Sequence, residues 1–358
     1  MSMLNFALVG CGRIAKRHSE LLGLDQIKGA RLVAVCDNVI EKAEKIAKQF
    51  NVSPYDDMDE MMSFETIDIV VVLTPSGLHA EHVIKLSKYG KHIMVEKPMA
   101  LTTEDTENMI YACDATNIKL FIIKQNRFNV PVVKLKEALD AGRFGNLILG
   151  TVRVRWARHQ AYYDQDPWRG TWAMDGGVLT NQASHHVDML EWMMGDVESV
   201  FAKITTALAD VETEDTAIVT LKFKNGALGI IEATTATRPA NLEGSISILG
   251  EKGTVVIGGV AVNEMQTWMF EDEQVGDADV KVKYSVNPPN VYGFGHQAYY
   301  EHVVHCVVNG GANLVDGLQG YKSIELISAI YESAETGKEV FLKFQPKFCR
   351  LGQKSSTA

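Results

Sequence analysis

The chain has 358 residues, which is enough for two domains of ordinary size and a substantial buried core. Hydrophobic residues make up 46% of it and charged residues 22%, a composition typical of globular proteins. The formal net charge of -10 argues against nucleic acid as a partner, because phosphate binding needs clustered Lys and Arg. No apolar run reaches the roughly 20 residues of a membrane helix, so we expect no membrane partner either.

The N-terminus and the cysteines indicate the compartment. The first apolar stretch has no basic region before it and leads directly into a glycine motif, which favours a strand over a signal peptide. The 5 cysteines are odd in number and show no CxxC spacing, which favours reduced thiols. We therefore expect a cytoplasmic protein.

Residues 1–124 alternate short apolar runs with segments of helical periodicity. Runs that are rich in Val and Ile and lack in-out alternation are typical of strands buried on both faces of a parallel sheet. The predicted strands are 5–9, 31–36, 67–73, 92–95 and 120–123, and the predicted helices are 13–22, 41–50, 78–89 and 104–116. The pattern predicts a doubly wound α/β domain of the Rossmann type.

Residues 125–346 have a different character. Between 197 and 257 several strand-like runs are joined by turn signals, which indicates an α/β domain with an open, mostly antiparallel sheet. A strand is also predicted at 147–156, and helices at 131–141, 177–194, 297–308 and 318–335. We expect this domain to bind the substrate and to form oligomers, and the polar tail 347–358 to fray.

A glycine motif follows the first strand directly and opens the first helix: Gly10-Cys11-Gly12-Arg13-Ile14-Ala15. Gly10 permits a tight turn, and Gly12 lets the backbone approach a pyrophosphate. The phosphates would lie at the helix N-terminus, where free N–H groups and the dipole favour negative charge, so Arg13 and Ile14 are included in the predicted cofactor site.

Asp37 ends the second predicted strand at the spacing that a dinucleotide site requires. A carboxylate there accepts hydrogen bonds from the adenosine ribose hydroxyls and repels a 2′-phosphate. The next residue is Asn38 and not Arg, so NAD is predicted over NADP. The plainer alternatives are a simple turn with Asp37 as a helix cap, or the similar loop of a methyltransferase.

Two more polar motifs end predicted strands, where doubly wound sheets place their ligands. Thr74-Pro75 ends the predicted strand 67–73 and is followed by His79, and Glu96-Lys97-Pro98 ends the predicted strand 92–95. Together with the Gly10 motif and a later Gly-Gly-x5-His segment that ends at His185, they resemble the glucose–fructose oxidoreductase / inositol dehydrogenase / MocA family. The resemblance covers residues 4 to about 344.

The resemblance implies an NAD-dependent dehydrogenase with a Rossmann domain and a second α/β domain whose open sheet mediates dimers or tetramers. It places Lys97 and a histidine beside the nicotinamide and the reacting carbinol, and adds Thr74, His79 and Glu96 to the cofactor contacts. The Lys97 ammonium could stabilise the developing alkoxide, or take the proton itself if it is desolvated. The plain alternative for Lys97 is a surface lysine.

The predicted helix 177–194 carries the other half of the expected site. His185 matches the family's histidine and can act as a general base at neutral pH, whereas the adjacent His186 is expected to be structural. Asn181, one turn earlier, is expected to position the substrate, although inositol dehydrogenase-like members have Asp there. A metal site of His185, His186 and Asp188 is the alternative, but adjacent histidines diverge on a helix, so we expect no metal.

Five further stretches narrow the resemblance to UDP-N-acetylglucosaminuronate 3-dehydrogenases; they are residues 124–129, 162–165, 168–172, 181–182 and 292–296. This subgroup oxidises the sugar C3 hydroxyl to a ketone, which a pyridoxal-phosphate aminotransferase then aminates, during synthesis of bacterial surface polysaccharide such as lipopolysaccharide. Some members keep NADH bound and reoxidise it with 2-oxoglutarate.

The same resemblance assigns further contacts. The cofactor contacts are Gln125, Trp168 and Arg169, and the substrate contacts are Lys97, Arg127, Tyr163, Asn181, His185 and Tyr292. A UDP-uronate is anionic and needs cationic donors. Tyr162, Tyr163 and Tyr292 could stack on a sugar or uracil, or could simply be buried. Arg153 and Arg155 alternate with apolar residues, which favours the polar face of a strand or an oligomer interface over a ligand site.

Two other functions remain open. A free polyol or aldose such as inositol would suit the same fold, although Asn181 in place of Asp disfavours it. A non-catalytic NAD-binding regulator is the other, and the presence of both Lys97 and His185 disfavours that.

Overall fold

The computed structural model describes residues 3–285, 295–342 and 351–352. The chain divides into two compact units. The first unit comprises Met1–Lys124 and Gln297–Lys322, and the second comprises Gln125–His296 and Ser323–Ala358. The segment 297–322, whose helical pattern suggested a place in the second domain, thus groups with the first unit.

A six-stranded parallel sheet forms the centre of the first unit, in the order β3-β2-β1-β4-β5-β6. Its strands are β1 (Leu4–Val9), β2 (Ala30–Cys36), β3 (Ser53–Tyr55), β4 (Ile69–Val72), β5 (His92–Val95) and β6 (Leu120–Ile122). All four residues of β4 are Ile or Val and all are buried, as expected for a strand covered on both faces. The predicted doubly wound fold is confirmed, and the order reverses beside β1, where such sheets bind ligands.

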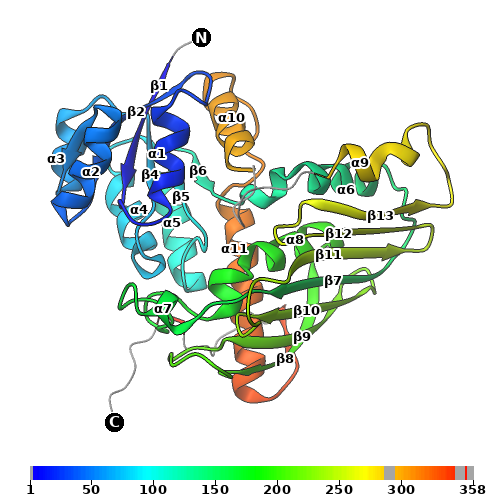
Figure 1. The fold of residues 1–358 in the computed structure, drawn as a ribbon. Helices are drawn as coiled ribbons and strands as arrows, with labels where there is room; N and C mark the ends of the chain where they lie inside the picture. Colours follow the sequence, from blue (N-terminus) through cyan, green and yellow to red (C-terminus); the bar gives the residue numbers. More distant parts are fainter. Residues whose placement is uncertain (1–2, 286–294, 343–350, 353–358) are drawn as a thin grey trace. The chain divides into compact units, whose positions relative to one another are not determined.

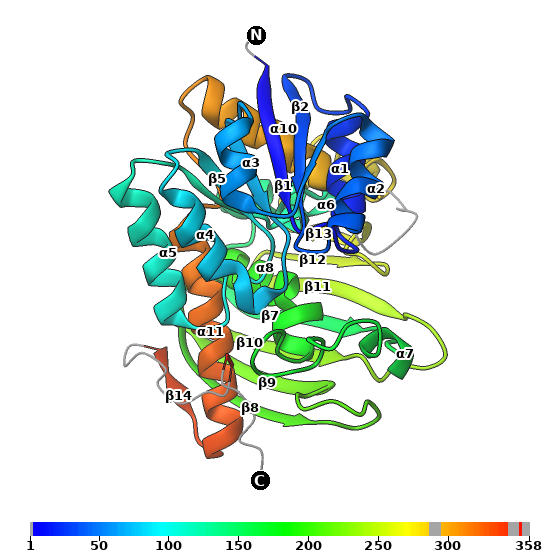
Figure 2. The same cartoon turned by 90° about the vertical axis from the view of Figure 1, so that its left-hand side faces the viewer.

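Helices cover both faces of this sheet (Figure 2). They are α1 (Ala15–Gly23), α2 (Ile40–Phe50), α3 (Met58–Phe64), α4 (His79–Ser87) and α5 (Thr103–Ala115). Figure 2 shows α1 and α2 on one side and α4 and α5 on the other, as right-handed crossovers on either side of β1 require. The helix α10 (Gly295–Val308) also belongs here, because Tyr300 packs edge-on against Phe6 of β1, with ring centroids 5.6 Å apart.

The second unit is built on an eight-stranded mixed sheet, in the order β13-β12-β11-β7-β10-β9-β8-β14 (Figure 1). Only β7 and β10 pair in parallel among its described strands, so the predicted open, mostly antiparallel sheet is confirmed. The strands are β7 (Leu147–Arg155), β8 (Val197–Thr205), β9 (Thr216–Phe223), β10 (Leu228–Thr234), β11 (Glu243–Gly250), β12 (Gly253–Gly258), β13 (Glu264–Phe270) and β14 (Val340–Phe341).

One face of the mixed sheet carries the core of the second unit. In β9, Val219, Leu221 and Phe223 are buried, whereas the alternate residues Ile218 and Thr220 are exposed. The helix α8 (Ser184–Met194) packs against β7 and β11 on the buried face. The remaining helices of this unit are α6 (Val130–Asp140), α7 (Gln160–Tyr163), α9 (Val280–Lys283) and α11 (Gly317–Thr336), the last of which begins in the first unit.

The helix predicted over 177–194 is interrupted in the structure. Residues Val178–Gln182 form a π-helical turn, and the regular helix α8 begins only at Ser184. Gly176 has φ +78°, and a Cβ atom on Gly177 would lie 2.0 Å from a carboxylate oxygen of Glu214. The two glycines therefore bring the chain against a distant acidic side chain, and a π turn is a frequent marker of a functional segment.

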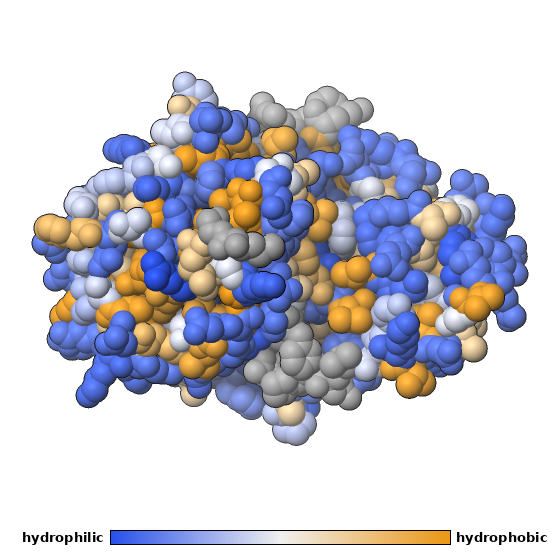
Figure 3. All heavy atoms as spheres, turned by 90° about the horizontal axis from the view of Figure 1, so that it is seen from above, coloured by the Kyte–Doolittle hydropathy of each residue, from blue (hydrophilic) through white to orange (hydrophobic). Residues whose placement is uncertain are grey.

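The surface has the mixed character of an ordinary exposed face. Figure 3 shows hydrophilic residues over most of the side viewed, with hydrophobic residues scattered among them. Within the described residues, no helix is long and apolar enough to cross a membrane.

Candidate active site

The glycine loop has the shape that a pyrophosphate needs. Gly10 has φ +97°, and a Cβ atom there would lie 2.8 Å from the backbone of Leu73 and Thr74, so only glycine fits. A Cβ atom on Gly12 would meet no described atom within 4 Å, so its backbone is open to a ligand. Arg13 is exposed and Ile14 is the N-cap of α1, where the helix dipole favours an anion.

Asp37 is held ready to accept hydrogen bonds. Its Oδ2 accepts the Cys11 N–H at 2.7 Å, and its Oδ1 accepts the Val39 N–H at 2.9 Å. The side chain is half-buried just beyond the end of β2, beside the glycine loop. The glycine cradle, the helix N-terminus and this oriented carboxylate therefore fit an NAD molecule bound across the switch point of the sheet.

His79 braces two strand ends of the first unit. One ring nitrogen, Nε2, lies 2.8 Å from the Thr74 carbonyl oxygen, and Nδ1 lies 2.8 Å from that of Pro98. The side chain is buried, and burial lowers its pKa below the ordinary value. The Thr74 hydroxyl in turn meets His82 Nδ1 at 2.9 Å. This geometry gives His79 a bracing role, and its predicted contact with the cofactor stays a prediction.

Glu96 and Lys97 follow β5, and the Lys97–Pro98 peptide bond is cis. Glu96 is buried, and its Oε2 accepts the Lys97 N–H at 2.9 Å. Its Oε1 lies 3.0 Å from Nε2 of the buried His18, from α1. Lys97 itself is half-buried, and its backbone is held by the hydrogen bond to Glu96. The predicted catalytic lysine thus stands on a rigid support.

In the second unit, His185 lies in the first turn of α8 and is buried. The side-chain nitrogen of Gln125 lies 2.9 Å from its Nε2. With the amide in this orientation, the Gln125 N–H donates and Nε2 accepts with its lone pair. Gln125 is a predicted cofactor contact, and the structure places it against the predicted base. His186 is fully buried and packs edge-on against Trp156, in keeping with its predicted structural role.

Arg127 forms a buried, two-point ion pair with Asp188. Its Nε and Nη2 donate to the two carboxylate oxygens at 2.8 and 2.7 Å, and both side chains are under 5% exposed. The guanidinium also lies 4.7 Å from the ring centroid of Trp192. Ser323 donates to the same carboxylate at 3.0 Å. Arg127 therefore anchors α8, and its predicted contact with the substrate stays a prediction.

Asn181 lies in the π-helical turn and donates a hydrogen bond to Asp175. Its side-chain oxygen accepts from Gln182 Nε2 at 2.8 Å, while Asp175 also accepts the Gly170 N–H at 2.8 Å. A carboxylate at position 181 would face the carboxylate of Asp175, and two such groups repel. This neighbourhood therefore favours an amide over a carboxylate at position 181.

Tyr162 contacts both Gln182, the residue after Asn181, and two arginine side chains. Its hydroxyl accepts from Gln182 at 3.0 Å and from Arg169 at 2.9 Å, and burial raises its pKa. The guanidinium of Arg169 lies 4.7 Å from the Tyr162 ring centroid and 4.6 Å from that of Trp168. Arg158 approaches the same tyrosine at 5.4 Å. Two cations thus lie beside the turn that carries Asn181, although Arg169 also pairs with a carboxylate 3.0 Å away.

The other predicted contacts are less directly placed. The Tyr163 hydroxyl bonds with the Thr235 hydroxyl at 3.0 Å, and burial raises the pKa of Tyr163. Tyr292 lies outside the described residues. Arg155 pairs with Glu232 at 2.6 Å on the face of the sheet away from α8. It therefore lies on the polar face of its strand, as expected from the sequence. Lys97 belongs to the first unit and His185 to the second.

Several neighbours of the site were not predicted from the sequence. The contacts of Asp175 and Gln182 with Asn181 have no signal in the local sequence. The same holds for the pairing of Asp188 with Arg127. Glu214 was not predicted either. It accepts hydrogen bonds from the Leu179 N–H at 3.0 Å and from the Tyr331 hydroxyl at 2.8 Å. The sequence signal that could have pointed to it is an acidic residue just before the alternating strand β9.

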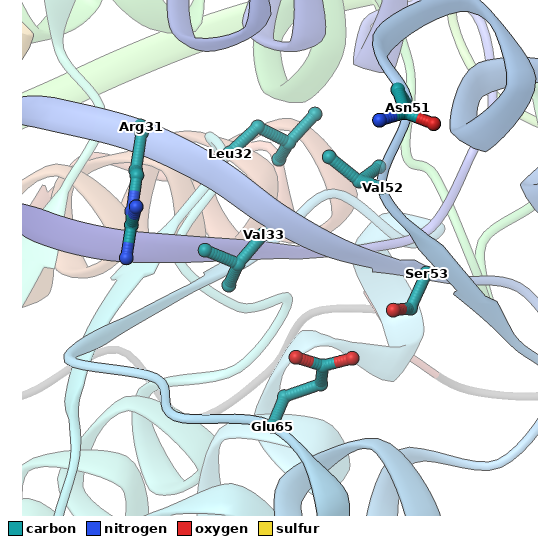
Figure 4. Close-up of a pocket in the computed structure, with 7 residues that line it drawn as sticks. All are labelled: Arg31, Leu32, Val33, Asn51, Val52, Ser53 and Glu65. Carbon is teal, nitrogen blue, oxygen red and sulfur yellow. The ribbon is translucent and has the colours of Figure 1, made fainter.

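A hollow of about 510 Å³ opens elsewhere in the first unit (Figure 4). Its lining is Arg31, Leu32, Val33, Asn51, Val52, Ser53 and Glu65. Arg31 and Val33 belong to the first half of β2, whereas ligands of doubly wound sheets lie beyond the carboxyl ends of the strands. The hollow is therefore separate from the dinucleotide loop.

Comparison with known proteins tests the resemblance. The model described as "Oxidoreductase family, NAD-binding Rossmann fold" (GFO/IDH/MocA) matches residues 4–123. The companion model, "Oxidoreductase family, C-terminal alpha/beta domain", matches residues 136–342. Myo-inositol 2-dehydrogenase of Thermotoga maritima is 30% identical over 288 residues, which cover 78% of this chain and 82% of that protein.

Two solved structures are more similar. The WlbA dehydrogenase from Bordetella pertussis, in complex with NADH and UDP-GlcNAcA, is 42% identical with a TM-score of 0.91, covering 95% of this chain and 98% of that one. The WlbA dehydrogenase from Chromobacterium violaceum, with the same two ligands, is 42% identical with a TM-score of 0.89, covering 95% and 96%. The chain therefore belongs to the GFO/IDH/MocA oxidoreductase family and is an NAD-dependent dehydrogenase that acts on CH–OH groups.

Proposed function

We propose that the protein oxidises the C3 hydroxyl of UDP-N-acetylglucosaminuronate to the 3-keto sugar and transfers the hydride to NAD. The observation that carries this proposal is the 42% identity, over 95% of the chain, to a WlbA dehydrogenase solved with NADH and UDP-GlcNAcA. The first unit, residues 1–124 and 297–322, would bind the cofactor, and the second unit would bind the sugar.

The residue chemistry supports an alcohol oxidation. NAD, when bound, supplies the hydride acceptor. His185 takes the hydroxyl proton at Nε2, where the substrate hydroxyl would replace the Gln125 N–H as the partner of the ring lone pair. Lys97 stabilises the developing alkoxide, and its fixed backbone limits the reorganisation that this requires. Asn181, oriented by Asp175, holds a substrate hydroxyl.

The charges beside the π-helical turn support an anionic sugar. Arg158 and Arg169 both lie beside the Tyr162 ring, and a guanidinium group in that position presents its N–H edge next to the ring. Some of these N–H groups already donate within the protein, from Arg158 to Ala157 and Asn241 and from Arg169 to Asp166. A carboxylate or diphosphate on the substrate would be recognised by such edges, whereas a free polyol has no charge for them to bind.

The product and the setting follow from the same proposal. A 3-keto sugar is the substrate that a pyridoxal-phosphate aminotransferase would aminate, in the cytoplasm, on the way to surface polysaccharide. We also propose a dimer or tetramer formed through the exposed face of the mixed sheet. On that face Leu228, Ile230 and Ile218 are exposed apolar residues on neighbouring strands.

The test is turnover of purified protein on UDP-N-acetylglucosaminuronate, with and without 2-oxoglutarate, following NADH and the keto product. The second condition matters because a retained cofactor needs an acceptor before turnover is visible. Lys97→Met should abolish turnover while NAD affinity stays within a few-fold, a loss of on the order of 3 kcal/mol in barrier stabilisation. Turnover of myo-inositol or glucose, with none on the UDP-uronate under either condition, would refute the substrate and leave the dehydrogenase assignment standing.

A further inference from the structure

A chain of buried hydrogen bonds ends at the backbone of Lys97. Its members come from three separate parts of the first unit: Tyr300 from α10, His18 from α1, and Glu96 from the end of β5. The Tyr300 hydroxyl lies 2.7 Å from His18 Nδ1, and His18 Nε2 lies 3.0 Å from Glu96 Oε1. The second oxygen, Glu96 Oε2, accepts the Lys97 N–H at 2.9 Å.

The donors in this chain run in one direction. With the ring proton on Nε2, His18 donates to the Glu96 carboxylate and accepts the Tyr300 hydroxyl at Nδ1, and each of these atoms then has a partner. Burial raises the pKa of Tyr300 well above its ordinary value, which keeps the proton on the donating hydroxyl. Every group in the chain is satisfied by its neighbour, and Tyr300 and His18 are fully buried.

Packing holds the same groups in place. The Tyr300 ring lies edge-on to both the Phe6 ring and the His18 ring, with centroids 5.6 and 5.7 Å apart. Tyr300 and His18 are both fully buried, and a close-packed interior disfavours a change of rotamer, which helps to hold the Glu96 carboxylate in place. The direction in which Lys97 leaves β5 depends on that carboxylate.

We infer that His18 and Tyr300 are positioning residues for Lys97, acting through the Glu96 carboxylate. The inference rests on the role proposed for Lys97 in the reaction. It gives the glutamate of the Glu-Lys-Pro motif a role: one Glu96 oxygen is bound by His18, and the other accepts the backbone N–H of Lys97. Misplacing a reacting group by even 1 Å costs about a hundredfold in rate.

The chain offers a matched pair of variants. Tyr299 is also fully buried on α10, and its hydroxyl donates to the Ile122 carbonyl at 2.7 Å, away from Glu96. Tyr300→Phe and Tyr299→Phe each remove one buried hydroxyl. We expect Tyr300→Phe to lower kcat on the UDP-uronate about tenfold or more with the Kd of NAD within twofold, and Tyr299→Phe to keep kcat within twofold.

A double variant separates positioning from a general loss of structure. If Tyr300 acts only through Glu96, then Tyr300→Phe combined with Glu96→Gln should lose no more kcat than the more damaging single variant. Additive losses would overturn the inference. Should Tyr300→Phe fail to fold, His18→Leu decides the question by the same measurements, because it removes both ring nitrogens and so breaks the link between Tyr300 and Glu96.

A measurement that needs no substrate tests this inference separately from the proposed function. The reactivity of the Lys97 amine is measured by acetic anhydride labelling across pH in the full chain, with the labelled peptide quantified by mass spectrometry. We expect the Lys97 profile to change in Tyr300→Phe and not in Tyr299→Phe. Identical profiles in the two variants would overturn the inference, whereas a wild type that ignores the UDP-uronate but shows the labelling difference would overturn only the substrate.

Discussion

Glu214→Gln should change how the stability of the second unit depends on pH. Glu214 lies just before β9 and is buried, with one oxygen accepting from Leu179 and Tyr331 and the other against the backbone of Gly177. Burial in this setting raises the pKa of Glu214 to about 7, from an ordinary value of 4.5. The folded state therefore holds the Glu214 proton more tightly than the unfolded chain does.

The sign and the size follow from that difference. A raised pKa in the folded state contributes stability that is complete below the unfolded pKa and is lost as pH rises through about 7. One pKa unit is worth about 1.36 kcal/mol, so the loss between pH 5 and pH 8 comes to about 2.5 kcal/mol. Glutamine does not titrate, so the Glu214→Gln variant lacks this part of the pH dependence.

The assay is urea unfolding from pH 5 to pH 8, followed by tryptophan fluorescence. Trp172 reports on this region because its ring lies 5.2 Å from that of Tyr331, the donor to Glu214. Glu212→Gln, two residues away and exposed, is the control and should follow the wild type at every pH. Wild-type and Glu214→Gln free energies of unfolding that stay parallel across this range would refute the reasoning.

Three further variants test the site itself. Asp37→Ala should narrow the preference for NAD over NADP by about tenfold, measured by titrating both cofactors, because the carboxylate that repels a 2′-phosphate is gone; an unchanged preference would refute that role. Arg127→Met should cost about 3–5 kcal/mol of stability in thermal unfolding, since it leaves the Asp188 charge buried and unpaired. Asp140→Ala is the control: it removes the exposed partner of Lys136 and should cost at most about 1 kcal/mol. His185→Asn should remove the histidine-like limb from the pH profile of kcat, and a limb that persists would show that another group is the base.

Much of the fold was predictable because it depends on local pattern. The apolar runs of the first unit became the strands β1, β2, β4, β5 and β6, since a strand buried on both faces must be continuously apolar. The strand β3 was not predicted, because three residues that include Pro54 have no periodicity to recognise. The segment 297–322 has the same helical pattern whichever unit it joins, so only packing assigns it to the first.

The sequence predicted the residue types of the site but not which side chains contact each other. Gly10, Asp37 and Lys97 stand at strand ends, which sequence order reveals. The pairing of Gln125 with His185 joins positions 60 residues apart, and no local pattern carries that information. The break before α8 escaped prediction for the same reason, because the buried carboxylate against Gly177 comes from the start of another strand.

The return of α10 and the segment after it to the first unit has a consequence for biosynthesis. The strand β6 is the edge of the parallel sheet, and its Leu120 carbonyl is bonded by the side chain of Asn313, 193 residues later. Ile122 likewise donates its N–H to the Val315 carbonyl at 3.0 Å. At 5–20 residues per second, the ribosome would need roughly 10–40 s to deliver the partners of that edge. The first unit is begun first, yet its last segment, 297–322, is made only after most of the second unit, and until then β6 presents an open edge on which another nascent chain could pair.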